Sequence, residues 1–245
     1  MPPRRRAAGR AMIPFPLRVH GIINRKADII LALCPRAAER RVGQLYHSRF
    51  AFPVEYNRNG RFLPVWHFVK HFKTITRHRH LVMRHCRRAG IFWQGCRHDL
   101  SKYSPSEFLA GAKYYQGHRS PNERERELFG YSAAWLHHKG RNKHHFEYWT
   151  DYNPETKTMS PVKMPLRYLV EMFCDRVAAS KIYFGPDYTD RAPLDYFLTS
   201  KVTRVIHPET SGQLEHLLTL LANEGEAAAF AAIRALLREE RIEQK

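Results

Sequence analysis

The stretch VWHFVKHFKTITRHRHLVMRHCRRAG, residues 65–90, decides the fold. Apolar residues recur along it at intervals of three, four or seven positions: Phe68, Phe72, Ile75, Val82 and Cys86. This spacing places them on one side of an α-helix. Gly90 ends the pattern, as glycine commonly does just after a helix. The stretch therefore predicts an amphipathic helix over residues 65–89.

Three histidines on this helix lie seven residues apart, at His71, His78 and His85. They flank the apolar stripe, whereas the basic residues of the helix occupy the other side. An imidazole that faces a core is either hydrogen-bonded and inert or a ligand of a metal. Taken singly, each of the three is predicted to be inert.

Further helices are predicted along the rest of the chain. Two of them begin with the same signature, Ser104-Pro105-Ser106-Glu107 and Ser120-Pro121-Asn122-Glu123. Serine at the N-cap, proline at N1 and glutamate at N3 can satisfy the free backbone donors of a first turn. The predicted ranges are 105–115, 121–138, 165–184, 193–203, 209–222 and 224–240. Because no series of alternating strand residues occurs, the predicted fold class is all-α.

Charge divides the chain of 245 residues, whose formal net charge is +18. The first 104 residues carry 22 Lys and Arg against 4 Asp and Glu, and the remaining residues carry 19 of each. An anionic partner would be steered toward the basic part if it forms one face, although a solvated basic tail is the alternative. We expect a disordered basic leader over 1–20, a helical extension and linker over 21–64, and a helical domain over 65–245.

His98 and Asp99 stand side by side just before a predicted helix. An adjacent imidazole and carboxylate can bind one divalent cation, and the carboxylate can also bridge to a second. Asp175 lies in the middle of another predicted helix, among apolar residues and four positions after Glu171. A carboxylate there is costly to bury unless it is paired or metal-bound. These residues predict a metal site.

The order His78, His98-Asp99, Asp175 resembles the HD-domain superfamily of metal-dependent phosphohydrolases, and HDLSK is similar to a variant of its central motif. The segments HDLSKYSPSEF, AWLHHKGRNKHHFEYW and MPLRYLVEMFCDRVAAS also resemble an uncharacterised bacterial and phage domain family, over about residues 66–196. The first resemblance implies an HD-like helical bundle with metals at its centre. Two departures leave the substrate open: Ser101 replaces a usual glycine, and the Gly-Tyr-Pro signature of the binuclear enzymes is absent.

The resemblance also implies roles for individual residues. The implied metal ligands are His78, His98, Asp99, Asp175 and, for a second metal, His138, His144 and His145. Asp99 would bridge the metals and, with Lys102, form the catalytic pair. Lys102 and Arg141 could bind a substrate phosphate, and Glu147 and Glu171 could orient the imidazoles, although all four could equally be surface residues. Helical spacing favours His138 over His137 as the inward member of its doublet.

The leading functional hypothesis is a cytoplasmic metal-dependent hydrolase of a phosphoester in a nucleotide or another phosphorylated small molecule. It requires one or two divalent metal ions, and Mn, Fe, Mg and Zn are not distinguished. One alternative is a nucleic-acid-binding protein that uses the basic N-terminal region, with a structural histidine cluster. Another is a di-iron oxygenase on the same ligands. No membrane partner is expected, because no apolar stretch approaches the ~20 residues of a span.

Overall fold

The computed structural model describes residues 65–199 and 204–243. Of these residues, 74% are helical, so the all-α prediction is confirmed. The helices are α3 (Val65–Ala89), α4 (Phe92–Arg97), α5 (Pro105–Lys113), α6 (Pro121–Phe129), α7 (Ala133–Lys139), α8 (Leu166–Phe184), α9 (Ala192–Thr199) and α10 (Pro208–Glu243). Three short 3-10 helices accompany them, η1 (Leu100–Tyr103), η2 (Phe146–Tyr148) and η3 (Gly185–Asp187). The predicted leader, the extension over 21–64 and most of the basic region proposed for nucleic acid lie outside the described residues.

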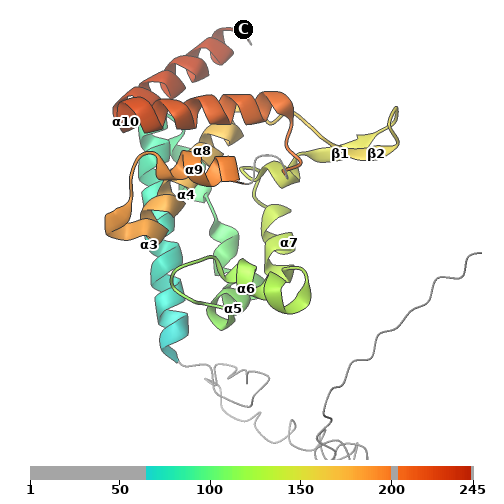
Figure 1. Ribbon diagram of the computed structural model, residues 1–245, viewed down its shortest axis with the longest axis vertical. Helices are drawn as coiled ribbons and strands as arrows, with labels where there is room; N and C mark the ends of the chain where they lie inside the picture. The colour runs from blue at the N-terminus through green and yellow to red at the C-terminus, as the bar shows by residue number, and fades with distance from the viewer. Residues whose placement is uncertain (1–64, 200–203, 244–245) are drawn as a thin grey trace, which may run out of the picture. The chain divides into compact units, whose positions relative to one another are not determined.

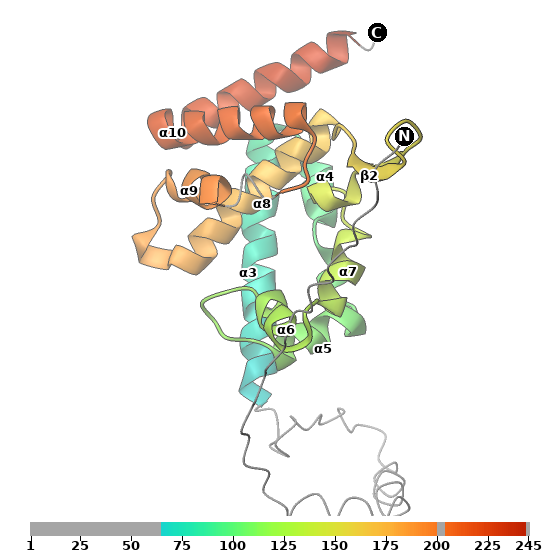
Figure 2. The same cartoon turned by 45° about the vertical axis from the view of Figure 1, so that its right-hand side comes forward.

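Helix α3 is the long helix that the sequence predicts, and it ends at Gly90, whose φ is 89°. Its inward side differs from the prediction in one respect. Phe72 is 48% exposed, whereas all three histidines at seven-residue intervals are buried. Helix α8 runs beside one half of α3, and α5 packs against the other half (Figures 1 and 2). Polar imidazoles therefore replace part of the expected apolar stripe where these helices meet.

The prediction of one helix over 121–138 is wrong, because two helices occupy this range. Helix α6 ends at Gly130, which adopts a left-handed conformation with φ 78°. Ser132 then caps α7, and its hydroxyl accepts a hydrogen bond from the backbone N–H of Trp135 at 3.0 Å. Glycine reaches such a φ without strain, so it allows the chain to turn between the helices.

The two predicted helix starts are confirmed, but the predicted caps are wrong. The hydroxyls of Ser104 and Ser120 make no capping hydrogen bond with the helices they precede. Glu107, expected to cap the first turn of α5, is buried and binds two histidines instead. Proline at the first helical position, with its restricted φ, remains as the local reason for these starts.

A small hairpin, not predicted from the sequence, follows η2. Strands β1 (Thr150–Asn153) and β2 (Thr158–Pro161) pair antiparallel, with Thr150 opposite Pro161 and Asn153 opposite Thr158. Most of its side chains are exposed or half-buried, so it has none of the regular alternation that marks a strand with one buried face. This explains why the sequence pattern did not reveal it.

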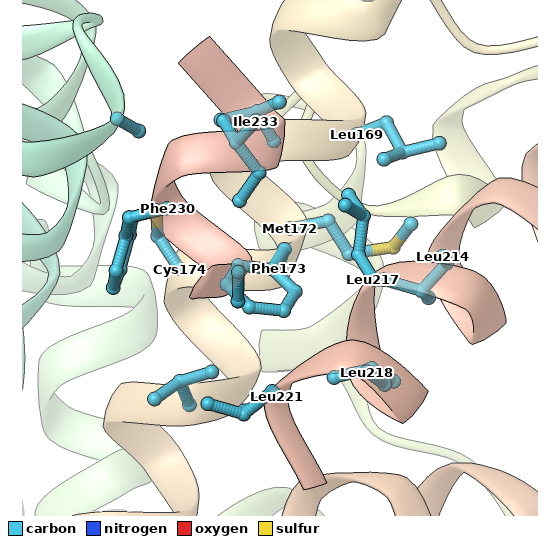
Figure 3. Close-up of a cluster of buried hydrophobic side chains, with 14 of the residues drawn as sticks. Leu169, Met172, Phe173, Cys174, Leu214, Leu217, Leu218, Leu221, Phe230 and Ile233 are labelled. Carbon is cyan, nitrogen blue, oxygen red and sulfur yellow. The ribbon is translucent and has the colours of Figure 1, made fainter. Parts of the chain in front are cut away.

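The apolar core lies mainly between α8 and the two arms of α10, and Figure 3 shows their side chains facing one another. Its fully buried members include Phe173 of α8 and Leu218 and Phe230 of α10. The arms meet at Gly225, where φ is 80° and ψ is 179°, in agreement with the two helices predicted on either side. No described helix is both long and apolar enough to cross a bilayer. The core thus anchors α8, the helix that carries Glu171 and Asp175.

Candidate metal centre

Side chains from five parts of the fold converge beside α3. They are His78 of α3, His98 and Asp99 between α4 and η1, His138 of α7, His144 and His145 before η2, and Asp175 of α8. These are the residues that the sequence analysis named as ligands, and all but His145 and Asp175 are buried. The structure therefore brings together groups that lie up to 97 residues apart in the chain.

The backbone around Asp99 places its carboxylate at the middle of this cluster. Asp99 adopts a left-handed conformation, with φ 54° and ψ 24°, which aspartate tolerates better than most residues. It stands at the N-cap of η1 but makes no capping hydrogen bond with its side chain. Its carboxylate consequently remains available to the surrounding histidines.

The two oxygens of Asp99 face two different sets of imidazoles. Oδ2 lies 3.2 Å from His98 Nε2 and 3.8 Å from His78 Nε2. Oδ1 lies 3.3 Å from His138 Nε2 and 3.4 Å from His144 Nε2. Asp99 is thus shared by two groups of potential ligands, as a bridging carboxylate would be.

Asp175 completes the first of these groups. Its Oδ1 lies 2.9 Å from His78 Nε2 and 3.6 Å from His98 Nε2. The first group is His78, His98, Asp99 and Asp175, and the second is Asp99, His138, His144 and His145. In each group the ligand atoms lie within 4.8 Å of one another. Nitrogen and carboxylate donors in sets of four suit zinc, manganese or iron.

The cluster contains many buried polar atoms that make no hydrogen bond among the described residues. They are Nε2 of His78, His98, His138, His144 and His145, and both carboxylate oxygens of Asp99. Close contacts exist between these atoms, and Asp99 Oδ2 also lies beside the Lys102 ammonium, but none of these contacts has hydrogen-bond geometry. A buried polar group without a partner costs about 1–3 kcal/mol. One or two divalent cations between these atoms would satisfy them together, so the residues fit a metal.

Two carboxylates behind the cluster hold the opposite nitrogens of its histidines. Oε1 of Glu171 accepts a hydrogen bond from Nδ1 of His98 at 2.9 Å and lies 3.2 Å from Nδ1 of His144. Oε2 of Glu107 accepts one from Nδ1 of His138 at 2.7 Å. A proton on Nδ1 leaves Nε2 as the nitrogen that can bind a metal. His98, His144 and Glu171 also come close enough to hold an ion, but these contacts already account for their proximity.

At the centre, neighbouring opposite charges shift the pKa values of His98 and the aspartates more than burial does. Burial lowers the pKa of His98, but Asp99 and the other carboxylates raise it well above its usual value. Burial raises the pKa of Asp99, but His98 and Lys102 bring it well below its usual value. The pKa of Asp175 is likewise low, because its interactions with His78 and His98 outweigh its burial. Both aspartates are therefore ionised near neutral pH, and a cation that replaced the imidazole protons would find their charge in place.

Lys102 reaches into the same site from η1. Its Nζ lies 2.6 Å from Asp99 Oδ2. Burial lowers the pKa of Lys102, but Asp99 and Asp175 reverse this effect and raise it, so the ammonium keeps its proton. Lys102 supplies a fixed positive charge at the edge of the centre.

The remaining residues named from the sequence lie in different places. Glu171 contacts two imidazoles of the cluster, as described above. Glu147 is partly buried and lines the neighbouring cavity, but no contact with an imidazole occurs among the described residues. Arg141 is exposed, and its Nη1 donates a 3.4 Å hydrogen bond to the carbonyl of His137. Arg141 does not line the cavity in the described part of the chain.

Two residues that hold the centre were not named as site residues from the sequence. Glu107 holds His138, although its position in a capping pattern predicted a local role. Gln94 of α4 donates a hydrogen bond to Oε2 of Glu171 and thereby fixes that carboxylate. No local signal marks either residue, because their partners lie 31 and 77 positions away.

A cavity of about 600 Å³ opens beside the centre. Its lining includes His78, His138, His145, Asp175 and Lys102, so it reaches the candidate ligands. Aromatic side chains, Tyr115, Trp135 and Tyr183, also line it. A volume of this size suits a small molecule.

Comparison with known proteins gives one match. The model of a family of unknown function, DUF5662, matches residues 67–220. None of the curated proteins and none of the solved structures matches the chain. The matched range includes every residue of the candidate metal centre.

Proposed function

Since this chain belongs to the family of unknown function DUF5662, we propose its function from the chemistry of its centre: a metal-dependent hydrolase that cleaves a phosphoester in a nucleotide or another phosphorylated small molecule. The observation that carries the proposal is the position of Asp99. Its two oxygens face separate sets of imidazoles whose Nε2 atoms make no hydrogen bond within the part of the chain that the structure describes. A pair of cations bridged by one carboxylate is a common arrangement for phosphoester hydrolysis.

The ligands divide between two ions. His78, His98, Asp99 and Asp175 would hold one, and Asp99, His138, His144 and His145 the other. When bound, a divalent cation supplies Lewis acidity and lowers the pKa of a coordinated water toward neutrality. The order of these residues along the chain is the order on which the resemblance to HD-domain phosphohydrolases rests, and the proposed reaction agrees with that resemblance.

The chain's own residues prepare the site for this reaction. Glu171 and Glu107 hold the Nδ1 protons of three imidazoles, so the rings present Nε2 to the centre. Lys102 lies beside Asp99 and lines the cavity. Its ammonium can attract a phosphoryl oxygen as a point charge. The cavity admits a substrate of small-molecule size from this side.

We expect the enzyme to act in the cytoplasm. The three cysteines within the described residues, Cys86, Cys96 and Cys174, are free thiols. Disulfides persist mainly in oxidising compartments, so free thiols agree with a reducing one.

Elemental analysis of the full chain, purified without chelators, tests the proposal together with a screen of phosphoesters. The His98→Ala variant should lose both bound metal and hydrolysis, because it removes a ligand at the middle of the cluster. His216→Ala is the matched control, since His216 lies on α10 away from the centre. Metal content equal to wild type in His98→Ala would refute the proposal. Iron with visible absorption, and no hydrolysis of any ester, would favour the oxygenase instead.

A further inference from the structure

Arg176 lies next to Asp175 on α8 and lines the same cavity. Its guanidinium has no hydrogen bond and no ion pair among the described residues, and its Nε is completely enclosed. A guanidinium carries five donors and stays charged at any pH a protein meets. The side chain is half-buried, so part of the cost of removing its charge from water is not offset by a hydrogen bond or an ion pair. Among the described residues, no carboxylate or carbonyl oxygen therefore holds the Arg176 guanidinium.

A second arginine lies beside it. Arg204 donates hydrogen bonds to the carbonyls of Phe197 at 3.0 Å and Tyr196 at 3.3 Å, and it also lines the cavity. Its guanidinium lies 4.9 Å from the Phe197 ring, and that of Arg176 lies 5.8 Å from the same ring. Burial and the charge of Arg176 lower the pKa of Arg204 to about 10. Two like charges thus meet at one wall of the cavity.

Glu147 is an acidic residue that also lines the cavity. It forms no ion pair with Arg176 within the described residues, and its Oε2 is buried without a hydrogen bond. Burial raises the pKa of Glu147, although the charge of Arg176 acts in the opposite direction. The charge of Arg176 is therefore not neutralised by an ion pair with Glu147.

The arginines and the metal centre share this cavity. Arg176 follows Asp175 directly on α8, whereas Phe197 and Tyr196 belong to α9, which contributes no residue to either ligand group. An anion bound by Arg176 would therefore lie in the cavity that the candidate ligands also line. Arginine binds phosphate and carboxylate through paired hydrogen bonds, and both groups fit this chemistry.

We propose that Arg176, with Arg204 beside it, binds an anionic group of the substrate, a phosphate or a carboxylate, in this cavity. That the ligand is a substrate rests on the proposed function. The binding of an anion by Arg176 does not, because it needs no metal.

Calorimetric titration of the full chain with inorganic phosphate or malonate tests this, in excess chelator and at constant ionic strength. Arg176→Gln should weaken binding by at least about tenfold, and Arg176→Lys should weaken it less, since one charged hydrogen bond is worth this much or more. Arg238→Gln, an exposed position on α10, should bind as wild type does. The stronger probe identifies the anion. Equal binding by Arg176→Gln and wild type would overturn the proposal.

Thermal unfolding without added anion separates binding from a structural role. Removing an unpaired charge should leave the midpoint of Arg176→Gln unchanged or raise it. A clearly lower midpoint would assign Arg176 to stability and overturn the proposal. Phosphate binding without hydrolysis of any ester would leave the anion site standing and remove the hydrolase. Hydrolysis of an ester by Arg176→Gln with the same KM as wild type would instead support the hydrolase and overturn the anion site.

Discussion

Replacing Glu171 by glutamine tests whether the carboxylate behind the cluster orients the metal ligands. Glu171 is 5% exposed, and its Oε1 accepts a hydrogen bond from His98 and also contacts Nδ1 of His144. Glutamine has nearly the same shape but no charge. Loss of a carboxylate that supports ligating histidines typically weakens metal affinity about 10–100-fold. This corresponds to about 1.4–2.7 kcal/mol of binding free energy.

The same variant changes the pH dependence of stability. Burial raises the pKa of Glu171, but the two imidazoles lower it from 4.5 to about 2. Because the folded pKa lies below the unfolded one, this carboxylate stabilises the fold above about pH 4.5, and the effect is lost as the pH falls toward 2. The shift corresponds to about 3 kcal/mol at most. Glu171→Gln should lose this amount near neutral pH and show a flatter acid limb.

Competition between the protein and a chromophoric chelator for Zn²⁺ measures the affinity directly. Glu239→Gln, at an exposed position on α10, is the matched control and should bind as wild type does. Circular dichroism confirms that the helices persist in each variant. A Zn²⁺ affinity of Glu171→Gln within twofold of wild type would refute the orienting role of this carboxylate.

Four further variants probe the centre and its frame. Asp99→Asn should keep the fold, because asparagine tolerates the left-handed φ of 54°. Elemental analysis should show that it loses at least half of the bound metal. Full metal content would contradict the bridging role of Asp99. Burial lowers the pKa of His71 to about 4, so the free energy of unfolding should fall by up to about 3 kcal/mol as the pH drops from 6.5 to 4. Thermal unfolding measures this loss, which should be smaller in His71→Gln. An equal dependence of stability on pH in the two proteins would contradict this. A Cβ at Gly95 would lie 2.5 Å from that of Cys86, so Gly95→Ala should destabilise the protein by about 1–3 kcal/mol in urea. Gly212→Ala, with open space around it, should instead stabilise it by about 0.5–1 kcal/mol; the reverse order would refute the packing argument.

Much of the helical framework was predictable because its signals are local. The apolar spacing of α3, the Ser-Pro starts of α5 and α6, and the glycines after α3 and α8 all act within a few residues of the position they determine. The error over 121–138 has the same origin. Gly130 in the middle of a helical pattern can be tolerated or can end the helix, and packing decides between them.

The candidate site was partly predictable for a different reason. A carboxylate among apolar residues is unfavourable unless something satisfies it, so Asp175 stands out from its own neighbours. His78, predicted to be inert when taken singly, entered the ligand set through the resemblance to HD-domain phosphohydrolases. Residues that sit in an ordinary polar context give no such signal. Glu107 fits a capping pattern, yet it holds His138.

The sequence by itself determined the all-α class and most helix boundaries, because each follows from local spacing, and the chemistry of their side chains marked His98, Asp99 and Asp175 as candidate metal ligands. The other candidate ligands followed from the resemblance to HD-domain phosphohydrolases. Only the tertiary structure decided how those candidate ligands divide into two groups that share Asp99. Asp99 lies between two sets of imidazoles because α3, α7 and α8 converge on it. The structure also decided that Glu171 and Glu107 support the rings and that Arg176 Nε is buried without a hydrogen bond among the described residues. These are contacts between residues far apart in the chain, and their geometry exists only once the helices have packed.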